Sequence, residues 1–283
     1  MSRTFMVLGI EVASYRFFTI VGMMVGMTLC FRAFLELGLS KRKTLGFLLF
    51  MALGFLVGAR LWNVLVNPSN FGDALPWYSF RLVGLSLYGG IFGTGIVLLL
   101  GMKILQKPLF PLLDRLVVPS TLAFSLARVG CFLNGCCIGI ATNGPLGMIF
   151  PSKVIELEAL QKVFPYLSTH VHVHPTQLYE LFGALVGLVG VYVYRALCHP
   201  PAGSIFLLYG AWFSLVRLLV LPLRALGYPR VVTSVLYPGL YLFLILLCLV
   251  LFGKNMRTKE LSSWGKKEKA SQMKPEDLLE MNP

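Results

Sequence analysis

Seven separate apolar runs, each close to the length of a membrane-crossing helix, constrain what this chain can fold into. A helix needs about 20 apolar residues to cross the hydrocarbon core of a bilayer. The sequence therefore predicts an all-α fold, a polytopic membrane bundle of about seven transmembrane helices. The predicted spans cover residues 16–37, 45–66, 84–102, 109–128, 176–197, 203–222 and 232–253.

Composition agrees with this class and excludes several others. Apolar residues make up 57% of the chain and charged residues only 13%, whereas a soluble domain has about 45–50% and 25%. An ordinary water-soluble enzyme and a disordered chain are therefore excluded. The net charge of +13 is not gathered on one soluble face, so we expect no nucleic-acid partner.

The positive residues predict how the bundle is oriented. Lys and Arg stay on the cytoplasmic side of membrane proteins, so we expect the N-terminus outside and the C-terminus inside. Residues 1–253 then form the membrane domain, and residues 254–283 form a basic, flexible cytoplasmic tail. The first residues lack the pattern of a cleaved signal peptide. The charges that decide the orientation are Lys41, Arg42 and Lys43, Lys103 and Lys107, Arg195 with His199, and the lysines of the tail.

The connection over residues 129–175 is the longest between two spans, and it faces the outside in this topology. Loops of this length are uncommon in compact proteins and are often functional. Its first part, within Ala127–Gly139, contains an Arg, an Asn and several Gly, which permit a re-entrant turn. We therefore predict a binding loop there and place the chemistry at the outer face.

Four arginines lie within or at the outer ends of predicted spans, and Glu180 is the one clear acid near them. Ionisable groups in membrane spans are costly and usually functional. The guanidinium fork suits phosphate, and phospholipid head groups are the nearest phosphates. The alternative is that each arginine reaches the interface as a topology anchor. The four are Arg60, Arg128, Arg217 and Arg224.

Glycines cluster in the third predicted span, where Gly89 and Gly93 form a GxxxG pattern. Small residues at this spacing allow two helices to pack closely. The alternative is a bent segment whose backbone approaches a ligand. In that case Tyr88, directly before Gly89, would point into the ligand space.

The six cysteines divide into two groups. Cys30, Cys198 and Cys248 lie in or beside spans and are typical of small apolar fillers. The others lie on the outer side, where one disulfide with one thiol left over is plausible. Three thiols and three histidines are also possible zinc ligands, but their spacing is not that of a zinc finger, and we expect no metal. These residues are Cys131, Cys136, Cys137, His170, His172 and His174.

Two stretches of the sequence, one ending at Gly139 and one over His174–Glu180, resemble motifs of a known family, the bacterial phosphatidylglycerol–prolipoprotein diacylglyceryl transferases. The family signature G-R-x-G-N-F-x-N-G-E-x-x-G is similar to the stretch that ends at Gly139, and H-P-[ST]-Q-L-Y-E is similar to His174–Glu180. Tyr15 falls where the first helix of the family carries a tyrosine. The likeness covers about residues 10–253 and includes Arg128, Gly130, Phe132, Asn134 and Gly135 of the first motif.

The resemblance implies a function. Members of this family move the diacylglyceryl group of phosphatidylglycerol onto the cysteine thiol of a prolipoprotein lipobox, and glycerol-1-phosphate leaves. They need no metal and no soluble cofactor. The chain is then a multi-pass transferase of the bacterial cytoplasmic membrane, with membrane lipid around it and its active site facing the outer side.

The resemblance also implies which residues act. Arg128 and Arg217 are expected at the phosphate, with Tyr88 as a third catalytic residue. Substrate-binding roles fall on Tyr15, Arg60, Asn134, Gly139, His174, Gln177, Glu180 and Arg224.

Several positions depart from the family pattern. Tyr88 replaces a histidine, Leu221 replaces a glutamate, and Cys131 and Cys136 replace an Asn and a Glu. Tyrosine has a pKa near 10 and is a poor base at neutral pH, so either Tyr88 or another group such as His174 assists the thiol. Two alternatives stay open: a divergent transferase with another acceptor or phospholipid, and a non-catalytic lipid-binding or transport protein.

Overall fold

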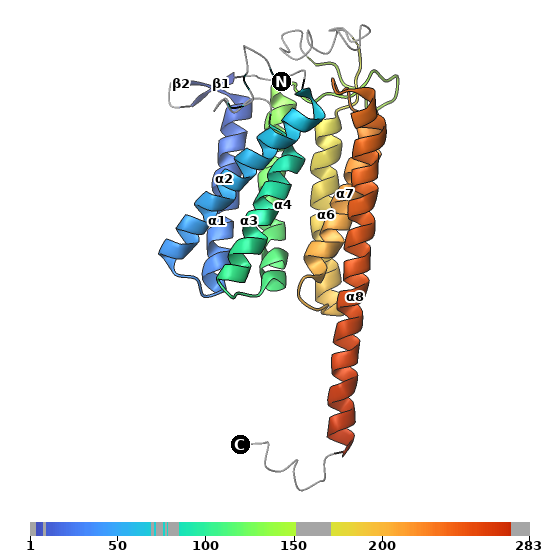
Figure 1. Cartoon of the computed structure of the whole chain (residues 1–283). Helices are drawn as coiled ribbons and strands as arrows, with labels where there is room; N and C mark the ends of the chain where they lie inside the picture. Colours follow the sequence, from blue (N-terminus) through green and yellow to red (C-terminus); the bar gives the residue numbers. More distant parts are fainter. Residues whose placement is uncertain are drawn as a thin grey trace.

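The computed structural model describes residues 4–7, 10–68, 71, 76, 78, 85–150 and 171–272. Within these residues, seven helices are long and apolar enough to cross a membrane, which confirms the predicted helical membrane bundle. They alternate in direction along the chain (Figure 1). The helices are α1 (Ser14–Glu36), α2 (Lys41–Val66), α3 (Leu87–Ile104), α4 (Leu109–Asn134), α6 (Thr176–Cys198), α7 (Ser204–Val220) and α8 (Tyr237–Gln272).

A short antiparallel hairpin precedes the bundle, and the all-α prediction missed it. Strand β1 (Thr4–Val7) pairs with β2 (Ile10–Ala13), with Thr4 opposite Ala13. Four-residue strands are too short to give a clear alternating pattern in the sequence. The hairpin lies at the end of the bundle where α4 ends and α6 begins (Figure 1), and this end is called the hairpin end below.

Helix α4 is longer than its predicted span, because it continues past Arg128 to Asn134. Gly135 then ends the helix in the left-handed conformation, with φ of 71°, which glycine adopts without steric cost. The predicted binding loop is therefore wrong in its first half. Arg128 and Cys131 lie on a regular helix, and only the residues after Gly135 form a loop.

A π-helical turn, η3 (Val232–Leu236), directly precedes helix α8, which continues to Gln272. The predicted domain boundary at residue 253 thus lies inside one continuous helix, which extends beyond the opposite end of the bundle (Figure 1). The tail from residue 273 onward lies outside the described residues, so its flexibility stays a prediction.

Glycines bring α2 and α3 into backbone contact. A Cβ atom added at Gly58 would lie 2.2 Å from the carbonyl oxygen of Gly89, and one added at Gly93 would lie 2.0 Å from that of Gly54. Neither distance is possible for a real side chain. Of the two interpretations of the GxxxG pattern, the structure therefore supports close helix packing.

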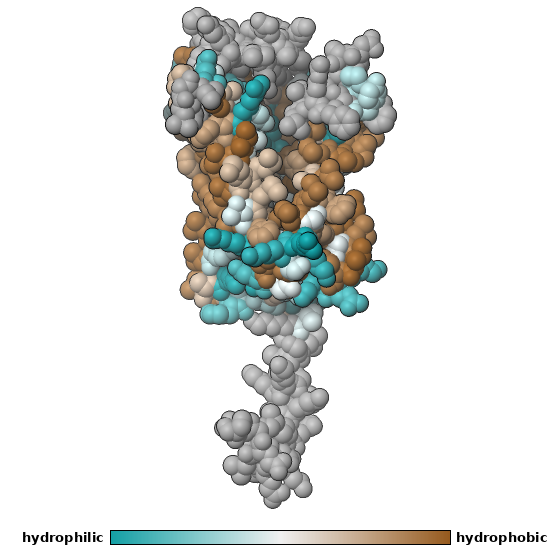
Figure 2. All heavy atoms as spheres, turned by 90° about the vertical axis from the view of Figure 1, so that its left-hand side faces the viewer, coloured by the Kyte–Doolittle hydropathy of each residue, from teal (hydrophilic) through white to brown (hydrophobic). Residues whose placement is uncertain are grey.

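The face of the bundle drawn in Figure 2 is apolar over much of its height, as expected for contact with lipid. Leu49, Phe50 and Leu53 of α2 are among the large exposed apolar side chains. On this face, hydrophilic residues gather near the end opposite the hairpin. Lys41 begins α2 at that end, and Lys107 lies between α3 and α4.

Candidate functional site

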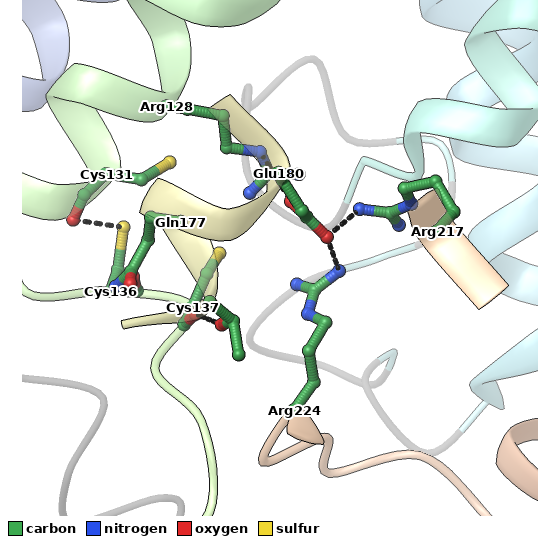
Figure 3. Close-up of polar contacts among 9 residues, drawn as sticks. Arg128, Cys131, Cys136, Cys137, Gln177, Glu180, Arg217 and Arg224 are labelled. Atoms are coloured by element: carbon green, nitrogen blue, oxygen red, sulfur yellow. Dashed lines mark hydrogen bonds and ion pairs between the residues drawn. The ribbon is translucent and has the colours of Figure 1, made fainter. Parts of the chain in front are cut away.

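One carboxylate contacts three guanidinium groups in the interior of the bundle (Figure 3). Oε2 of Glu180 lies 2.8 Å from Nε of Arg128, and Oε1 accepts a short hydrogen bond from Nη1 of Arg217. The same Oε1 lies 3.3 Å from Nη1 of Arg224. Below, these four residues are called the arginine cluster.

The arginine cluster joins segments that are far apart in the sequence. Arg128 comes from α4, Glu180 from α6 and Arg217 from α7, while Arg224 follows the short helix η2 (Leu221–Leu223). Glu180 is only 1% exposed, and such a buried charge is stable only when it is paired. Three guanidinium groups and one carboxylate leave a net charge of 3 − 1 = +2.

Aromatic rings support two of the arginines. The Cζ atom of Arg128 lies 4.9 Å from the ring centroid of Phe124, and that of Arg217 lies 5.5 Å from the ring of Tyr88. Tyr88 is buried and also packs against Tyr241 of α8, at 5.3 Å between ring centroids. Its ring thus stabilises Arg217 through a cation–π contact, and the structure brings all three predicted catalytic residues together.

The first turn of α6 holds the loop that follows Gly135. The Thr176 hydroxyl donates a hydrogen bond to the carbonyl of Cys137, at 2.8 Å, and the Gln177 amide donates one to the carbonyl of Cys136. Gln177 is fully buried. Its amide nitrogen therefore positions the protein backbone, and its contact with substrate stays a prediction.

Gly139 lies where three segments meet beside the arginine cluster. Its N–H donates to the carbonyl of His174, at 2.9 Å, and its backbone pairs with Arg224 in an isolated β-bridge. A Cβ atom at this position would lie 2.5 Å from the carbonyl oxygen of Leu223. Glycine is therefore required for Arg224 to approach. The ring of His174 lies beside Tyr179, with Nδ1 3.1 Å from the tyrosine Oη.

Besides Gly139, His174 and Gln177, three more predicted substrate-binding residues lie outside the arginine cluster. Tyr15 is in the first turn of α1, where its backbone lies against Gly130, and its side chain is 42% exposed. Arg60 stacks on Phe71, with 5.6 Å between its Cζ and the ring centroid. Asn134 is the last residue of α4. Their roles stay predictions.

Three thiols gather next to the arginine cluster. The Sγ atoms of Cys131, Cys136 and Cys137 all lie within 4.8 Å of one another, and we call these residues the thiol cluster. None of the six cysteines forms a disulfide, so the predicted disulfide is wrong. Among the described residues, no histidine belongs to this group, and His170 lies outside them.

The left-handed turn at Gly135 explains why sequence analysis missed this arrangement. The turn folds Cys136 and Cys137 back onto the last turn of α4, where the Cys136 thiol donates to the carbonyl of Cys131, at 3.6 Å. Hydrogen bonds from the other two thiols hold the pKa of the Cys137 thiol well below its usual range. The guanidinium groups of Arg224 and Arg128 lower this pKa further, and burial opposes the effect.

Comparisons with known proteins point to one family. The family described as prolipoprotein diacylglyceryl transferase matches residues 3–253. A phosphatidylglycerol–prolipoprotein diacylglyceryl transferase of Clostridium tetani is 27% identical over 254 residues, which cover 89% of this chain and 96% of that protein. Proteins of the same description from Campylobacter jejuni and Geobacter sulfurreducens are 26% and 32% identical, over 75% and 60% of this chain and 77% and 60% of their own lengths.

Proposed function

Since the chain belongs to the prolipoprotein diacylglyceryl transferase family, we propose that it transfers the diacylglyceryl group of phosphatidylglycerol to a prolipoprotein, at the thiol of the lipobox cysteine. Glycerol-1-phosphate is the leaving group. The observation that carries the assignment of the site is the arginine cluster, in which Glu180 contacts Arg128, Arg217 and Arg224.

The charge of the arginine cluster matches the charge that develops in this reaction. The thiol loses its proton to water, its sulfur forms a bond to the glycerol carbon, and the C–O bond of that carbon breaks. The electron pair of the broken bond goes to the phosphate oxygen. The phosphate thus changes from a monoanion to a dianion, and a site of net charge +2 stabilises the product-like transition state more than the bound lipid.

Each residue of the cluster has a separate role in this proposal. Arg128 and Arg217 bind the phosphate oxygens through their planar forks, and Arg224 adds a third donor. Glu180 holds the three side chains in place when no lipid is bound. Tyr88 supports Arg217 from below its guanidinium plane. Tyr15, Arg60 and Asn134 contact other parts of the two substrates.

The seven apolar helices and the bacterial relatives indicate a multi-pass protein of the inner membrane. The positive residues at the end opposite the hairpin favour a cytoplasmic location for that end. In this proposal the site opens toward the outer side. The face drawn in Figure 2 is hollowed in the half nearer the hairpin, and we propose that lipid enters there.

A divergent acceptor is the second candidate, because the chain differs from the family pattern beside the reacting groups. Tyr88 lies where the family has a histidine, and the thiol cluster lies where it has an Asn and a Glu. A different acceptor or a different phospholipid would leave the phosphate-binding role of the arginines unchanged. The products therefore distinguish the two candidates.

The test uses the full chain in lipid nanodiscs containing phosphatidylglycerol labelled in its head group, together with a lipobox peptide. We expect release of labelled glycerol-1-phosphate and a peptide heavier by one diacylglyceryl group. Arg128→Ala is expected to lose both, whereas Arg115→Ala, which removes an exposed ion pair with Glu36, is expected to keep both. Full release by Arg128→Ala contradicts the assigned site, and release without peptide modification favours another acceptor.

A further inference from the structure

The thiol cluster has the geometry of a metal site. Zinc–sulfur bonds of about 2.3 Å place the sulfurs of a tetrahedral site about 3.8 Å apart. The three Sγ atoms already lie within 4.8 Å of one another. Rotation of the thiols by small amounts therefore brings them to the distances that one metal ion requires.

The surrounding structure holds the thiol cluster in place. Cys131 lies in the last turn of α4, and the turn at Gly135 fixes the direction in which the chain returns. The side chains of Thr176 and Gln177 bind the carbonyls of Cys137 and Cys136, and Figure 3 shows Gln177 beside Cys136. Cys131 and Cys136 are buried, and Cys137 is partly exposed. The ligand atoms thus come from a helix end and a tethered loop.

We propose that Cys131, Cys136 and Cys137 bind one Zn²⁺ ion whose fourth coordination position takes the thiol of the acceptor protein. This inference rests on the proposed function and deepens it. It replaces the expectation from sequence that the protein works without a metal.

The number of ligands favours a reactive site over a purely structural one. Structural zinc sites have four protein ligands, whereas catalytic sites have three and keep one position for water or substrate. Among the described residues, the group contains three thiols and no fourth protein ligand. Thiolates select zinc or Cu(I) among biological metals. Zinc suits this reaction because it undergoes no redox change and deprotonates a bound thiol outright.

The charges keep the bound sulfur nucleophilic. One Zn²⁺ with three thiolates has a net charge of 2 − 3 = −1, so it withdraws little electron density from a fourth sulfur. Arg224 and Arg128 interact electrostatically with Cys137, and they stabilise the negative site. The same arginines belong to the cluster that binds the phosphate, so the sulfur and the leaving group are held next to each other.

Zinc also takes over the deprotonation of the acceptor thiol, for which Tyr88 is a poor base. Tyr88 occupies the position of the family's histidine, and its ring is buried beneath Arg217. In the zinc-assisted step, the acceptor thiol binds the metal and its proton passes to water. The sulfur lone pair then forms the S–C bond, the C–O bond breaks toward the phosphate, and the thioether product leaves zinc, whose oxidation state is unchanged.

The first measurement is the metal content of the full chain, purified under reducing conditions from cells supplied with zinc. We expect about one zinc ion per chain. The variants Cys131→Ser, Cys136→Ser and Cys137→Ser are expected to lose it, and the matched variants Cys30→Ser and Cys248→Ser to keep it. A wild-type protein without zinc, or one in which two of the three cysteines form a disulfide, overturns the proposal.

The second measurement replaces zinc by Co²⁺, whose visible spectrum reports its ligands. The sulfur-to-cobalt band is expected to increase when a lipobox peptide is added, and not when its cysteine is replaced by serine. An unchanged spectrum overturns the assignment of the fourth position. This readout needs no turnover.

Activity separates failure of this inference from failure of the proposed function. Removal of zinc by a chelator is expected to abolish glycerol-1-phosphate release, and added zinc to restore it. If the zinc-free enzyme releases glycerol-1-phosphate at the full rate, the inference is wrong and the proposed function stands. If the zinc-loaded protein releases none, the proposed function is wrong, and the role of zinc in it falls as well.

Discussion

The Glu180 carboxylate and the Arg128 guanidinium lie 2.8 Å apart between two neighbouring helices, α6 and α4. Glu180 is 1% exposed and Arg128 is 9% exposed. The pair therefore ties the two helices together close to the end of α4. Because Arg217 and Arg224 contact the same carboxylate, the Glu180 side chain positions three guanidinium groups.

Glu180→Gln is expected to destabilise the folded protein strongly, because it leaves three buried guanidinium groups without a counter-charge. Breaking a buried ion pair in this way costs about 3–5 kcal/mol. Thermal unfolding in detergent measures the change. Glu36→Gln serves as the control, since Glu36 pairs with Arg115 on the surface at 3.3 Å, and such pairs contribute about 0–1 kcal/mol. Equal shifts in the two variants contradict the role given to Glu180.

Arg217→Lys keeps the positive charge but loses the planar fork. We expect the rate of glycerol-1-phosphate release to fall by about 10–100-fold, because a lysine cannot bind a phosphate in the bidentate manner of an arginine. The rate constant at saturating phosphatidylglycerol measures this effect. A rate equal to that of the wild type would show that Arg217 acts only through its charge.

Tyr88→Phe and Tyr88→Leu separate the ring of Tyr88 from its hydroxyl group. The ring supports Arg217 from 5.5 Å, and a cation–π contact contributes about 0.5–2 kcal/mol. We expect Tyr88→Phe to keep most of the activity and Tyr88→Leu to lose about 2–30-fold. If both variants lose activity equally, the hydroxyl takes part in the chemistry.

Gly58→Ala is expected to separate α2 from α3, because its Cβ would lie 2.2 Å from the Gly89 carbonyl oxygen. Overpacking of this kind costs about 1–3 kcal/mol. The matched control is Gly95→Ala in α3, where nothing lies within 4 Å of the added Cβ. Melting temperatures of the two variants test the difference, and similar values would contradict tight packing at Gly58.

Gly139→Ala is expected to reduce activity more than stability. The added methyl group would displace Leu223 and His174, and Arg224 follows Leu223 directly. Displacement of Arg224 by 1 Å is enough to lower a rate by about 100-fold. Glycerol-1-phosphate release and the melting temperature, measured on the same preparation, test this. Gly144→Ala is the control on the same connection, since Gly144 is exposed.

Length and hydropathy predict the bundle because a membrane span is a local property of the sequence. Each predicted span falls on one helix, and Arg128 and Glu180 are conspicuous as charges in apolar surroundings. Their meeting with Arg217 and Arg224 depends on the packing of α4, α6 and α7. No periodicity in the sequence encodes these contacts, although each residue stood out as a charge in or near an apolar span.

The thiol cluster depends on a backbone turn that is not visible in hydropathy. The residues between Cys131 and Cys136 include Asn134 and Gly135. The three thiols meet because Gly135 adopts a positive φ and Gln177 binds the returning chain. Glycine directly before a vicinal cysteine pair, just past a helix, is the signal that would have suggested this turn.

The arginine cluster contains more guanidinium groups than carboxylates, and this excess of positive charge affects the stability of the folded protein. A buried surplus of positive charge repels itself until an anion enters. Under the proposed function, an anionic phospholipid is therefore both a substrate and a ligand that stabilises the folded bundle.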